Sequence, residues 1–426
     1  MVYFEYNMKI TKKLCFCLLL VGVFTFAPFA NASAEGGRYF VKSTKGFWKN
    51  TLNARHVFDN GFSADLSDFQ VRFAKLFGVE IEPVAALQIL PDEDLTLSTD
   101  SAKPSETPAL VPSKTPVQII KGQKGTARYV PSDPTPWGIE TIYNNSLIAS
   151  TSGGFGINVV VLDTGVNFNH PDLKGRLGQC KDFTNVRFPV VDNKCEDKNG
   201  HGTHVAGIIA ADAGADKLGI YGVAPSAKIF AYKVCGANGS CYADDIAVGL
   251  KTAVSQGANI VNMSFGTDRD ISLIKDAVND AWSKGVLLVA AAGNDGPFPD
   301  SIDYPGAYAS VVAVGAINES LNVVDWSSRG TNLSSTLGII EDRDIEFAVP
   351  GDSIESTWNN GGYVILSGTS MASPFVAGLA AKYWQSASSV NKAQTTREFL
   401  WKLAKDILPI GEDNYSGFGL PQVPAK

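Results

Sequence analysis

The chain has 426 residues, enough for two or three domains of average size. Apolar residues make up 45% of it and 41 residues are glycine, a composition typical of a large globular core with many tight turns. Its 43 acidic residues outnumber its 36 Lys and Arg, which gives a formal net charge of −7. This acidic balance argues against nucleic acid or an anionic membrane surface as a partner.

Residues 1–34 are typical of a signal peptide. Lys9, Lys12 and Lys13 precede the apolar run 14–27, and small residues suited to cleavage follow. The run is shorter than the ~20 residues that cross a bilayer comfortably. We therefore predict a secreted or periplasmic protein with no membrane attachment after signal removal, and an uncleaved anchor is the alternative.

Residues 35–90 predict a small α+β unit. Strand patterns occur at 39–42 and within 79–90, a helix is expected at 50–57, and Asp-Asn-Gly-Phe at 59–62 favours a turn. An ordinary accessory domain is the alternative interpretation of this segment.

Residues 91–128 have the composition of a linker, since Pro, Ser, Thr, Asp and Lys dominate most of it. Residues 129–426 then alternate strand and helix patterns. The apolar runs are short and unalternating, as in buried parallel strands, and lie at 158–162, 228–234, 260–263, 286–290 and 311–316. Amphipathic helices are expected between them, at 243–255 and 271–284. The pattern predicts an α/β fold, a parallel sheet between two layers of helices.

Three short strings carry the chemistry of this segment. Val-Val-Leu-Asp-Thr-Gly ends a buried strand with Asp163, His-Gly-Thr-His-Val-Ala-Gly opens a helix with His201, and Gly-Thr-Ser-Met-Ala-Ser-Pro places Ser370 just before a helix expected at 371–381. A nucleophilic hydroxyl needs a base, and the base needs an orienting carboxylate. An Asp-Thr-Gly aspartic-protease site would need a second copy of that motif, which the sequence lacks. His204, one helical turn after His201, is expected to pack rather than to bind a metal.

The three strings supply Asp, His and Ser in that order along the chain. With them, residues from about 134 to 420 resemble the subtilisin-like serine proteases, or subtilases. The resemblance implies a three-layer catalytic domain preceded by a small α+β prodomain that assists folding and blocks the active site. It assigns Asp163, His201 and Ser370 to the catalytic triad and Asn294 to the oxyanion hole. It also implies peptide or protein substrates, no cofactor for the chemistry, and a monomer.

The same resemblance places the substrate between two backbone edges. One edge contains Gly239 and Ser240, and the opposite edge contains Ser264, Phe265 and Gly266. A bound peptide would add a strand to these edges.

Two acidic residues are expected at the pocket for the residue before the cleaved bond. Asp295 matches its rim and Asp303 its floor, which favours substrates with Lys or Arg there. The alternative is that both are solvated loop acids. Maturation is expected after a basic residue, at Lys124–Gly125 or Arg128–Tyr129.

Calcium is the one metal that the resemblance suggests. Asp172 matches a calcium ligand of the family, and Asp216 lies in the loop 212–220 that would supply carbonyl oxygens. Lys217 in that loop argues against a bound cation.

Cys15 and Cys17 leave with the signal peptide, and four cysteines remain, an even number that favours disulfides in an exported chain. Of the three pairings, we predict Cys180–Cys195 and Cys235–Cys241, because each closes a short polar loop. Free buried thiols are the alternative.

Other functions remain to be weighed against a secreted serine endopeptidase made as a zymogen. Within the class, a narrow processing protease is one alternative to broad specificity. A catalytically idle binding module would keep the fold without turnover. An esterase is disfavoured because Gly-x-Ser-x-Gly is absent around Ser370.

Overall fold

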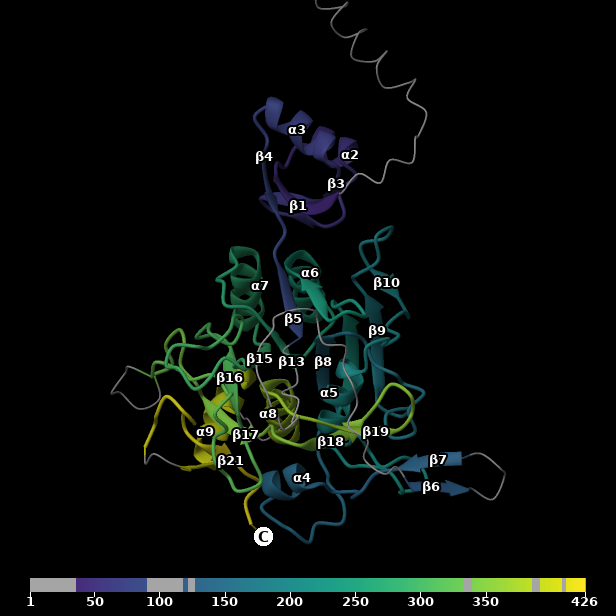
Figure 1. The fold of residues 1–426 in the computed structure, drawn as a ribbon, viewed down its shortest axis with the longest axis vertical. Helices are drawn as coiled ribbons and strands as arrows, with labels where there is room; N and C mark the ends of the chain where they lie inside the picture. The colour runs from purple at the N-terminus through teal and green to yellow at the C-terminus, as the bar shows by residue number, and fades with distance from the viewer. Residues whose placement is uncertain are drawn as a thin grey trace, which may run out of the picture.

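The computed structural model consists of a small N-terminal unit and a larger main body (Figure 1). It describes residues 36–89, 118–121, 127–332, 339–384, 391–407 and 411–425. The predicted signal peptide and most of the predicted linker lie outside these ranges. Within them, no helix combines the length and the apolar character needed to cross a membrane.

The N-terminal unit is a four-stranded sheet with two helices on its outer face (Figure 1). Its strands follow the order β2-β3-β1-β4, and its elements are β1 (Gly37–Lys42), α2 (Gly46–Thr51), β2 (Val57–Phe58), β3 (Gly61–Leu66), α3 (Asp68–Leu76) and β4 (Glu80–Pro83). The turn predicted at 59–62 is confirmed, because β2 and β3 pair as a hairpin across it.

Two helices of this unit depart from the sequence prediction. The helix predicted at 50–57 is wrong: α2 lies earlier and stops where Asn53 takes a left-handed conformation at φ 54°. The pattern analysis did not predict α3. It begins with a capping box in which Ser67 and Gln70 each accept from the other's backbone amide.

Alternation along β1 explains how the unit packs. Val41 faces the unit's own core with Trp48 and Phe62. Phe40, its neighbour, points the other way and joins Phe58 in a core that belongs to the main body. The sheet is therefore held between its own helices and those of the main body.

The main body is built on an eight-stranded sheet of order β10-β9-β11-β8-β13-β15-β16-β17. Neighbours from β9 to β17 pair in parallel, and β10 joins one edge antiparallel. The strands are β8 (Asn158–Asp163), β9 (Leu177–Asp182), β10 (Val191–Asp192), β11 (Lys228–Lys233), β13 (Ile260–Met263), β15 (Leu287–Ala291), β16 (Val312–Ile317) and β17 (Phe347–Pro350). The five predicted strands are confirmed, with ends shifted by at most one residue.

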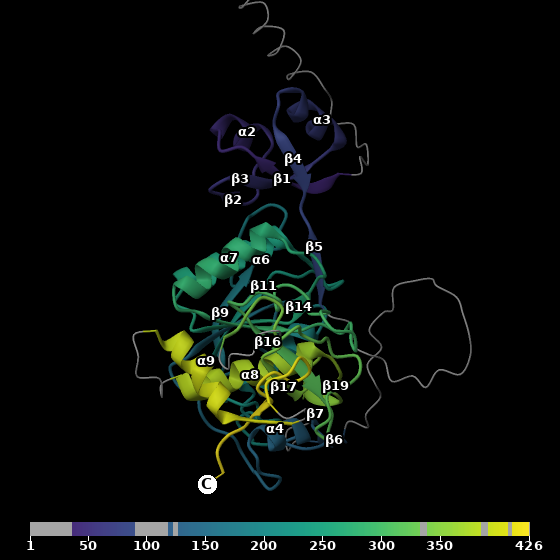
Figure 2. The same ribbon diagram turned by 90° about the vertical axis from the view of Figure 1, so that its left-hand side faces the viewer.

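Helices cover both faces of this sheet (Figure 2). Along β8, Val159 and Val161 join the core under α5 (His201–Ala210), α8 (Thr369–Tyr383) and α9 (Lys392–Leu403). Val160 and Leu162 join the core under α6 (Ala243–Ser255) and α7 (Ser272–Ser283). A strand buried on both faces explains the unalternating apolar runs and confirms the three-layer α/β fold.

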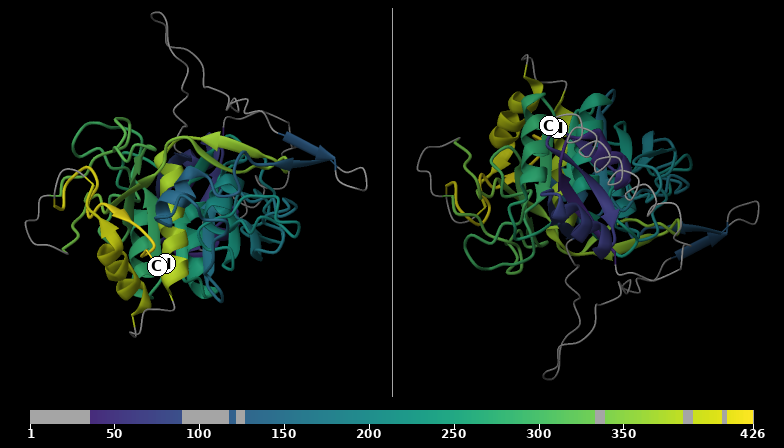
Figure 3. Two further views of the ribbon diagram at one scale, coloured as in Figure 1. Left: turned by 90° about the horizontal axis from the view of Figure 1, so that it is seen from below. Right: turned by 90° about the horizontal axis from the view of Figure 1, so that it is seen from above.

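Short elements complete the main body. They are α4 (Trp137–Ile142), the hairpin β18 (Ile354–Thr357) with β19 (Tyr363–Leu366), and the pair β20 (Ala404–Lys405) with β21 (Leu420–Pro421). A further hairpin, β6 (Gln118–Lys121) with β7 (Ala127–Val130), projects at the periphery (Figure 3). One expected maturation site, Arg128–Tyr129, lies in β7, and Lys124 lies outside the described residues.

Candidate active site

The carboxyl ends of three neighbouring strands carry or lead to predicted catalytic and substrate-binding residues. Asp163 is the last residue of β8. On the adjacent strand β13, Met263 pairs with Leu162, so Ser264 lies level with Asp163. Strand β15 follows on the other side of β13 and leads to Asn294. The carboxyl edge of a parallel sheet is where such folds place functional side chains.

Asp163 and His201 form a buried pair. The imidazole Nδ1 lies 2.9 Å from Asp163 Oδ1 and 3.0 Å from Oδ2. The Thr164 amide also donates to Asp163 Oδ1, at 2.7 Å. Because Nδ1–H donates to the carboxylate, the basic lone pair of the neutral ring is on Nε2, as a general base requires.

Asp197 holds the start of α5 in place. Its Oδ2 accepts from the Thr203 amide at 3.0 Å, and its Oδ1 accepts from the Gly200 amide at 2.8 Å. Gly200 has φ 119°, and a Cβ there would lie 2.3 Å from the Trp358 ring, so only glycine fits before His201. Asp197 was missed in the sequence, because Gly200 and not Asp197 holds the N-cap position at which a capping residue is sought.

Ser370 lies in the first turn of α8 rather than before the helix as predicted. Its Oγ donates to the Ser264 carbonyl at 3.2 Å, which fixes the hydroxyl at the sheet edge that carries Asp163. Amides in the first turn of a helix have no partner within that helix. They can therefore stabilise negative charge that develops beside Ser370.

Thr369 determines how the Asn294 side chain is oriented. Asn294 Oδ1 accepts from the Thr369 amide at 3.1 Å and from its hydroxyl at 2.9 Å. The other end of the side chain, Nδ2, would lie 3.5 Å from a Cβ on Gly368. The carboxamide thus presents its donor beside the turn that carries Ser370.

A strand of the N-terminal unit occupies the predicted substrate cleft. β5 (Ala86–Ile89) is the middle strand of a sheet of order β12-β5-β14, antiparallel to both β12 (Ser240–Tyr242) and β14 (Phe265–Gly266). The Ile89 amide also donates to the Gly239 carbonyl at 2.9 Å. These ladders use main-chain groups only, so a peptide of another sequence can take the place of β5.

Both predicted disulfides are confirmed. Cys180 is bonded to Cys195, and Cys235 is bonded to Cys241. The second bridge anchors β12, the strand that forms one wall of the cleft. It therefore braces the position of one of the two predicted substrate-binding edges.

Asp303 is buried between two backbone segments of the predicted pocket. A Cβ on Gly266 would lie 2.5 Å from Asp303 Oδ2, and a Cβ on Gly293 would lie 3.1 Å from the same atom. Burial, with a contribution from the charge of Asp295, raises the pKa of Asp303 to about 7. Asp295 itself is exposed. The predicted pocket thus holds a buried carboxyl group with a raised pKa.

Of the two predicted calcium ligands, only Asp172 is buried. Its Oδ2 accepts from the Tyr363 hydroxyl at 2.7 Å and from the Ile220 amide at 2.9 Å. Asp216 is exposed, and its Oδ1 accepts from the Leu218 amide at 3.2 Å. Asp172 therefore ties the loop down by hydrogen bonds, and calcium binding stays a prediction.

His204 packs in the core, as expected. Its Nε2 lies 3.1 Å from the carbonyl oxygens of both Ile354 and Val364. Burial, with a smaller contribution from His201, lowers the pKa of His204 to about 3. It is therefore a neutral hydrogen-bond donor at physiological pH.

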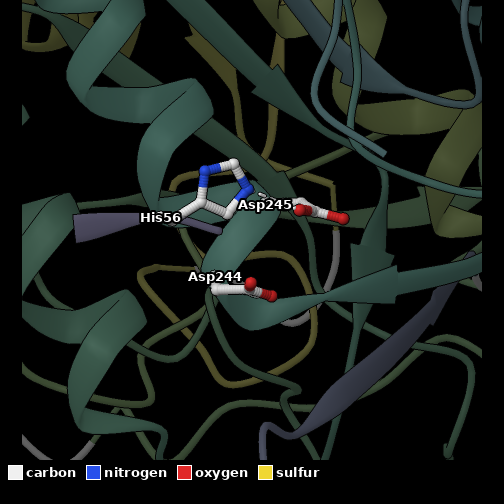
Figure 4. Close-up of side chains that lie close together, drawn as sticks. All are labelled: His56, Asp244 and Asp245. Atoms are coloured by element: carbon white, nitrogen blue, oxygen red, sulfur yellow. Dashed lines mark hydrogen bonds and ion pairs between the residues drawn. The ribbon is translucent and has the colours of Figure 1, made fainter. Parts of the chain in front are cut away.

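Within the described residues, one group of three side chains has metal-ligating atoms within 4.8 Å of one another: His56, Asp244 and Asp245 (Figure 4). His56 Nε2 lies 2.8 Å from Asp245 Oδ1. Arg38 pairs with both carboxylates and Arg55 pairs with Asp245. Two guanidinium groups repel a cation, so this group is an ion-pair cluster between the N-terminal unit and α6.

Comparisons with known proteins agree with this geometry. Residues 154–419 match the Subtilase family, Peptidase_S8. The chain is 41% identical to a subtilisin of Bacillus sp. (strain TA39), with 97% of this chain and 98% of that protein covered. It is 38% identical to Subtilisin Savinase of Lederbergia lenta, over 67% of this chain and 96% of that protein.

Two solved structures are also similar to this chain. The S41 Psychrophilic Protease is 49% identical with a TM-score of 0.66, covering 69% of this chain and 99% of that chain. Sphericase is 48% identical with a TM-score of 0.65, again covering 69% and 99%.

Proposed function

The chain belongs to the subtilase family of serine proteases, and from this premise we propose that it is a secreted endopeptidase made as a self-processing zymogen. One observation carries the proposal. β5, from the chain's own N-terminal unit, lies as an extended strand between β12 and β14, as a substrate would. It does so at the sheet edge where Asp163, His201 and Ser370 gather.

The proposed chemistry is acyl transfer. Ser370 Oγ attacks the carbonyl carbon of the bound peptide while His201 Nε2 takes the hydroxyl proton, and Asp163 stabilises the imidazolium. Asn294 Nδ2 and the Ser370 amide donate to the oxyanion. The imidazolium then protonates the leaving amine as the C–N bond breaks, and water hydrolyses the acyl-enzyme by the same steps.

Residues 35–90 are proposed to be the inhibitory and folding-assisting prodomain. Two observations support this proposal. Phe40 and Phe58 pack in the main-body core, and β5 pairs with β12 in the predicted cleft. Removal of the prodomain needs a cut between β5 and the catalytic domain, and we propose Lys124–Gly125 or Arg128–Tyr129. Mass spectrometry of the secreted protein gives the new N-terminus directly.

Cleavage after Lys or Arg is the proposed specificity, supported by the buried carboxyl of Asp303 between Gly266 and Gly293. A poorly solvated cation prefers a counter-ion nearby. Such a pocket also suits a narrow processing protease.

Structural calcium at Asp172 is proposed with carbonyl groups of the loop 212–220. A site filled at 100 times its Kd stabilises the fold by about 2.7 kcal/mol. We expect EGTA to lower the melting temperature of the Ser370→Ala chain by roughly 5–10 °C. Asp172→Asn should abolish this response, while Glu319→Gln, an exposed acid, should keep it. A melting temperature that EGTA leaves unchanged removes calcium from the proposal.

The catalytic proposal is tested by a fluorophosphonate probe, which reacts only with an activated serine hydroxyl. We expect stoichiometric labelling of the processed protein, mapped by peptide mass spectrometry to Ser370. A properly folded, processed protein that takes no label would instead be an idle binding module.

A further inference from the structure

The guanidinium group of Arg38, in the proposed prodomain, contacts an aromatic ring and two carboxylates of the main body. Its Cζ lies 3.9 Å from the centroid of the Tyr242 ring. Its Nη1 donates to Asp245 Oδ2 at 2.8 Å and to Asp244 Oδ1 at 3.2 Å. Stacking on an aromatic face combined with pairing to carboxylates is a recognition mode specific to arginine. We call Tyr242, Asp244 and Asp245 the guanidinium site.

The charges of this site are matched only while the prodomain is bound. Asp244 and Asp245 are fully buried in the first turn of α6. Burial alone would lower the pKa of Arg38, but the carboxylates of Asp245 and Asp244 outweigh it and raise that pKa. The other partners of Asp245 are Arg55 and His56, which also belong to the prodomain.

One acceptor of the guanidinium site is still unused in the precursor. Asp244 Oδ2 is buried and has no hydrogen-bond partner within the described part of the chain. A buried carboxylate oxygen without a donor costs free energy. The site can therefore accept one more N–H than Arg38 supplies, and release of the prodomain leaves both carboxylates without their cations.

The guanidinium site continues the substrate cleft. Tyr242 pairs with Ala86 of β5, and the next amide, that of Ala243, donates to the Ala85 carbonyl at 2.9 Å. One residue further upstream, the Val84 amide donates to the Arg38 carbonyl, also at 2.9 Å. Hydrogen-bonded strands lie about 4.8 Å apart. A substrate residue in the place of Val84 thus starts one strand spacing from the backbone of Arg38.

We propose that, in the processed enzyme, Tyr242, Asp244 and Asp245 form a subsite for the guanidinium group of a substrate arginine five residues upstream of the Ile89 position. The proposal rests on the proposed function, because the substrate is taken to replace β5. Before processing, Arg38 of the prodomain occupies this subsite. After processing, the arginine of a substrate makes the same contacts. An ammonium group would pair with the carboxylates but could not stack flat on Tyr242, so arginine is favoured over lysine.

The test compares two fluorogenic peptides cleaved by the enzyme that the full chain yields on processing. Both carry Ala-Leu-Gln-Ile, the sequence of β5, before a lysine and the reporter, and they differ only at the Val84 position, which is arginine or citrulline. Citrulline keeps the shape of the side chain and removes its charge. We expect roughly ten-fold higher kcat/KM for the arginine peptide, through a lower KM, as a charge-assisted contact supplies.

Substitutions in the guanidinium site test whether the preference for the arginine peptide arises there. Asp244→Asn and Asp245→Asn should each bring the ratio of the two kcat/KM values close to one by lowering kcat/KM for the arginine peptide. Tyr242→Leu, which keeps the main-chain ladder, should lower the ratio as well. Asp276→Asn is the matched control, because it removes one exposed acid from α7, the helix beside α6.

Equal rates for the two peptides in the unmodified enzyme overturn the subsite and leave the proposed function standing. A ratio that Asp276→Asn reduces as much as Asp244→Asn also overturns it, since the effect would then come from overall charge. An enzyme that cleaves neither peptide contradicts the proposed function itself, and the subsite with it.

Discussion

Ser370→Ala should lower kcat for peptide hydrolysis by roughly 10⁶-fold, the size of loss established for the nucleophile of subtilisin. The Ser370 hydroxyl oxygen is the atom proposed to form the acyl bond, and alanine has no atom in its place. The residual rate comes from binding and oxyanion stabilisation. The same variant should remain an unprocessed precursor, which gel electrophoresis and intact mass detect without any substrate.

Ser373→Ala is the matched control for this variant. Ser373 lies on the same helix, is also buried, and its Oγ lies 3.0 Å from the Ser264 hydroxyl. Its loss should cost about 1 kcal/mol of stability and leave processing intact. Full turnover by purified Ser370→Ala would contradict the assigned nucleophile, and equal loss in both variants would point to a folding defect.

The main sheet could be predicted from sequence because its strands are buried on both faces. Residues 260–263 and 243–255 were bounded correctly since apolar runs and amphipathic periodicity coincide there with the true element ends. The catalytic strings were recognisable because small residues and glycines are needed where helix, strand and substrate approach closely. At Gly200, for example, a Cβ would lie 2.3 Å from the Trp358 ring.

The remaining features depend on contacts between distant residues. Whether β5 forms a hairpin in its own unit or fills the cleft depends on Gly239 and Gly266, which lie far along the chain. The guanidinium site joins Arg38 to Asp245, 207 positions away. The helix α2 has only six residues, too few to show an amphipathic period. Spacing and composition carry no information about such pairings.

The preference for Lys or Arg before the cleaved bond should grow as pH rises through about 7, because burial raises the pKa of Asp303 to about 7. Below that pH the carboxyl is neutral and offers a cation no counter-charge. Above it the carboxylate pairs with the substrate. The ratio of kcat/KM for otherwise identical Lys and Gln peptides should rise by up to about ten-fold from pH 6 to pH 8, because the ionised fraction of a carboxyl with a pKa of about 7 rises from roughly 0.09 to roughly 0.91 over that range.

Taking a ratio removes any pH dependence that the two peptides share. Asp303→Asn should leave the ratio low and independent of pH, whereas Asp295→Asn, an exposed acid, should reduce it only slightly. A wild-type ratio that does not change with pH, or faster cleavage after Phe, Leu or Met at every pH, would contradict the pocket assignment.

The pH dependence of the unfolding free energy is an independent test of the pKa of Asp303. Its pKa is raised from 3.8 to about 7 by folding, so between these values the folded state holds a proton that the unfolded state has lost. The unfolding free energy therefore falls with rising pH across this window, by up to about 1.4 kcal/mol per pH unit, and the contribution is gone above pH 7. Asp303→Asn lacks this titration. In the Ser370→Ala background its melting temperature should exceed that of the Asp303 chain at pH 8 and approach it at pH 5. A difference between the two chains that stays the same from pH 5 to pH 8 would show that Asp303 is ionised throughout.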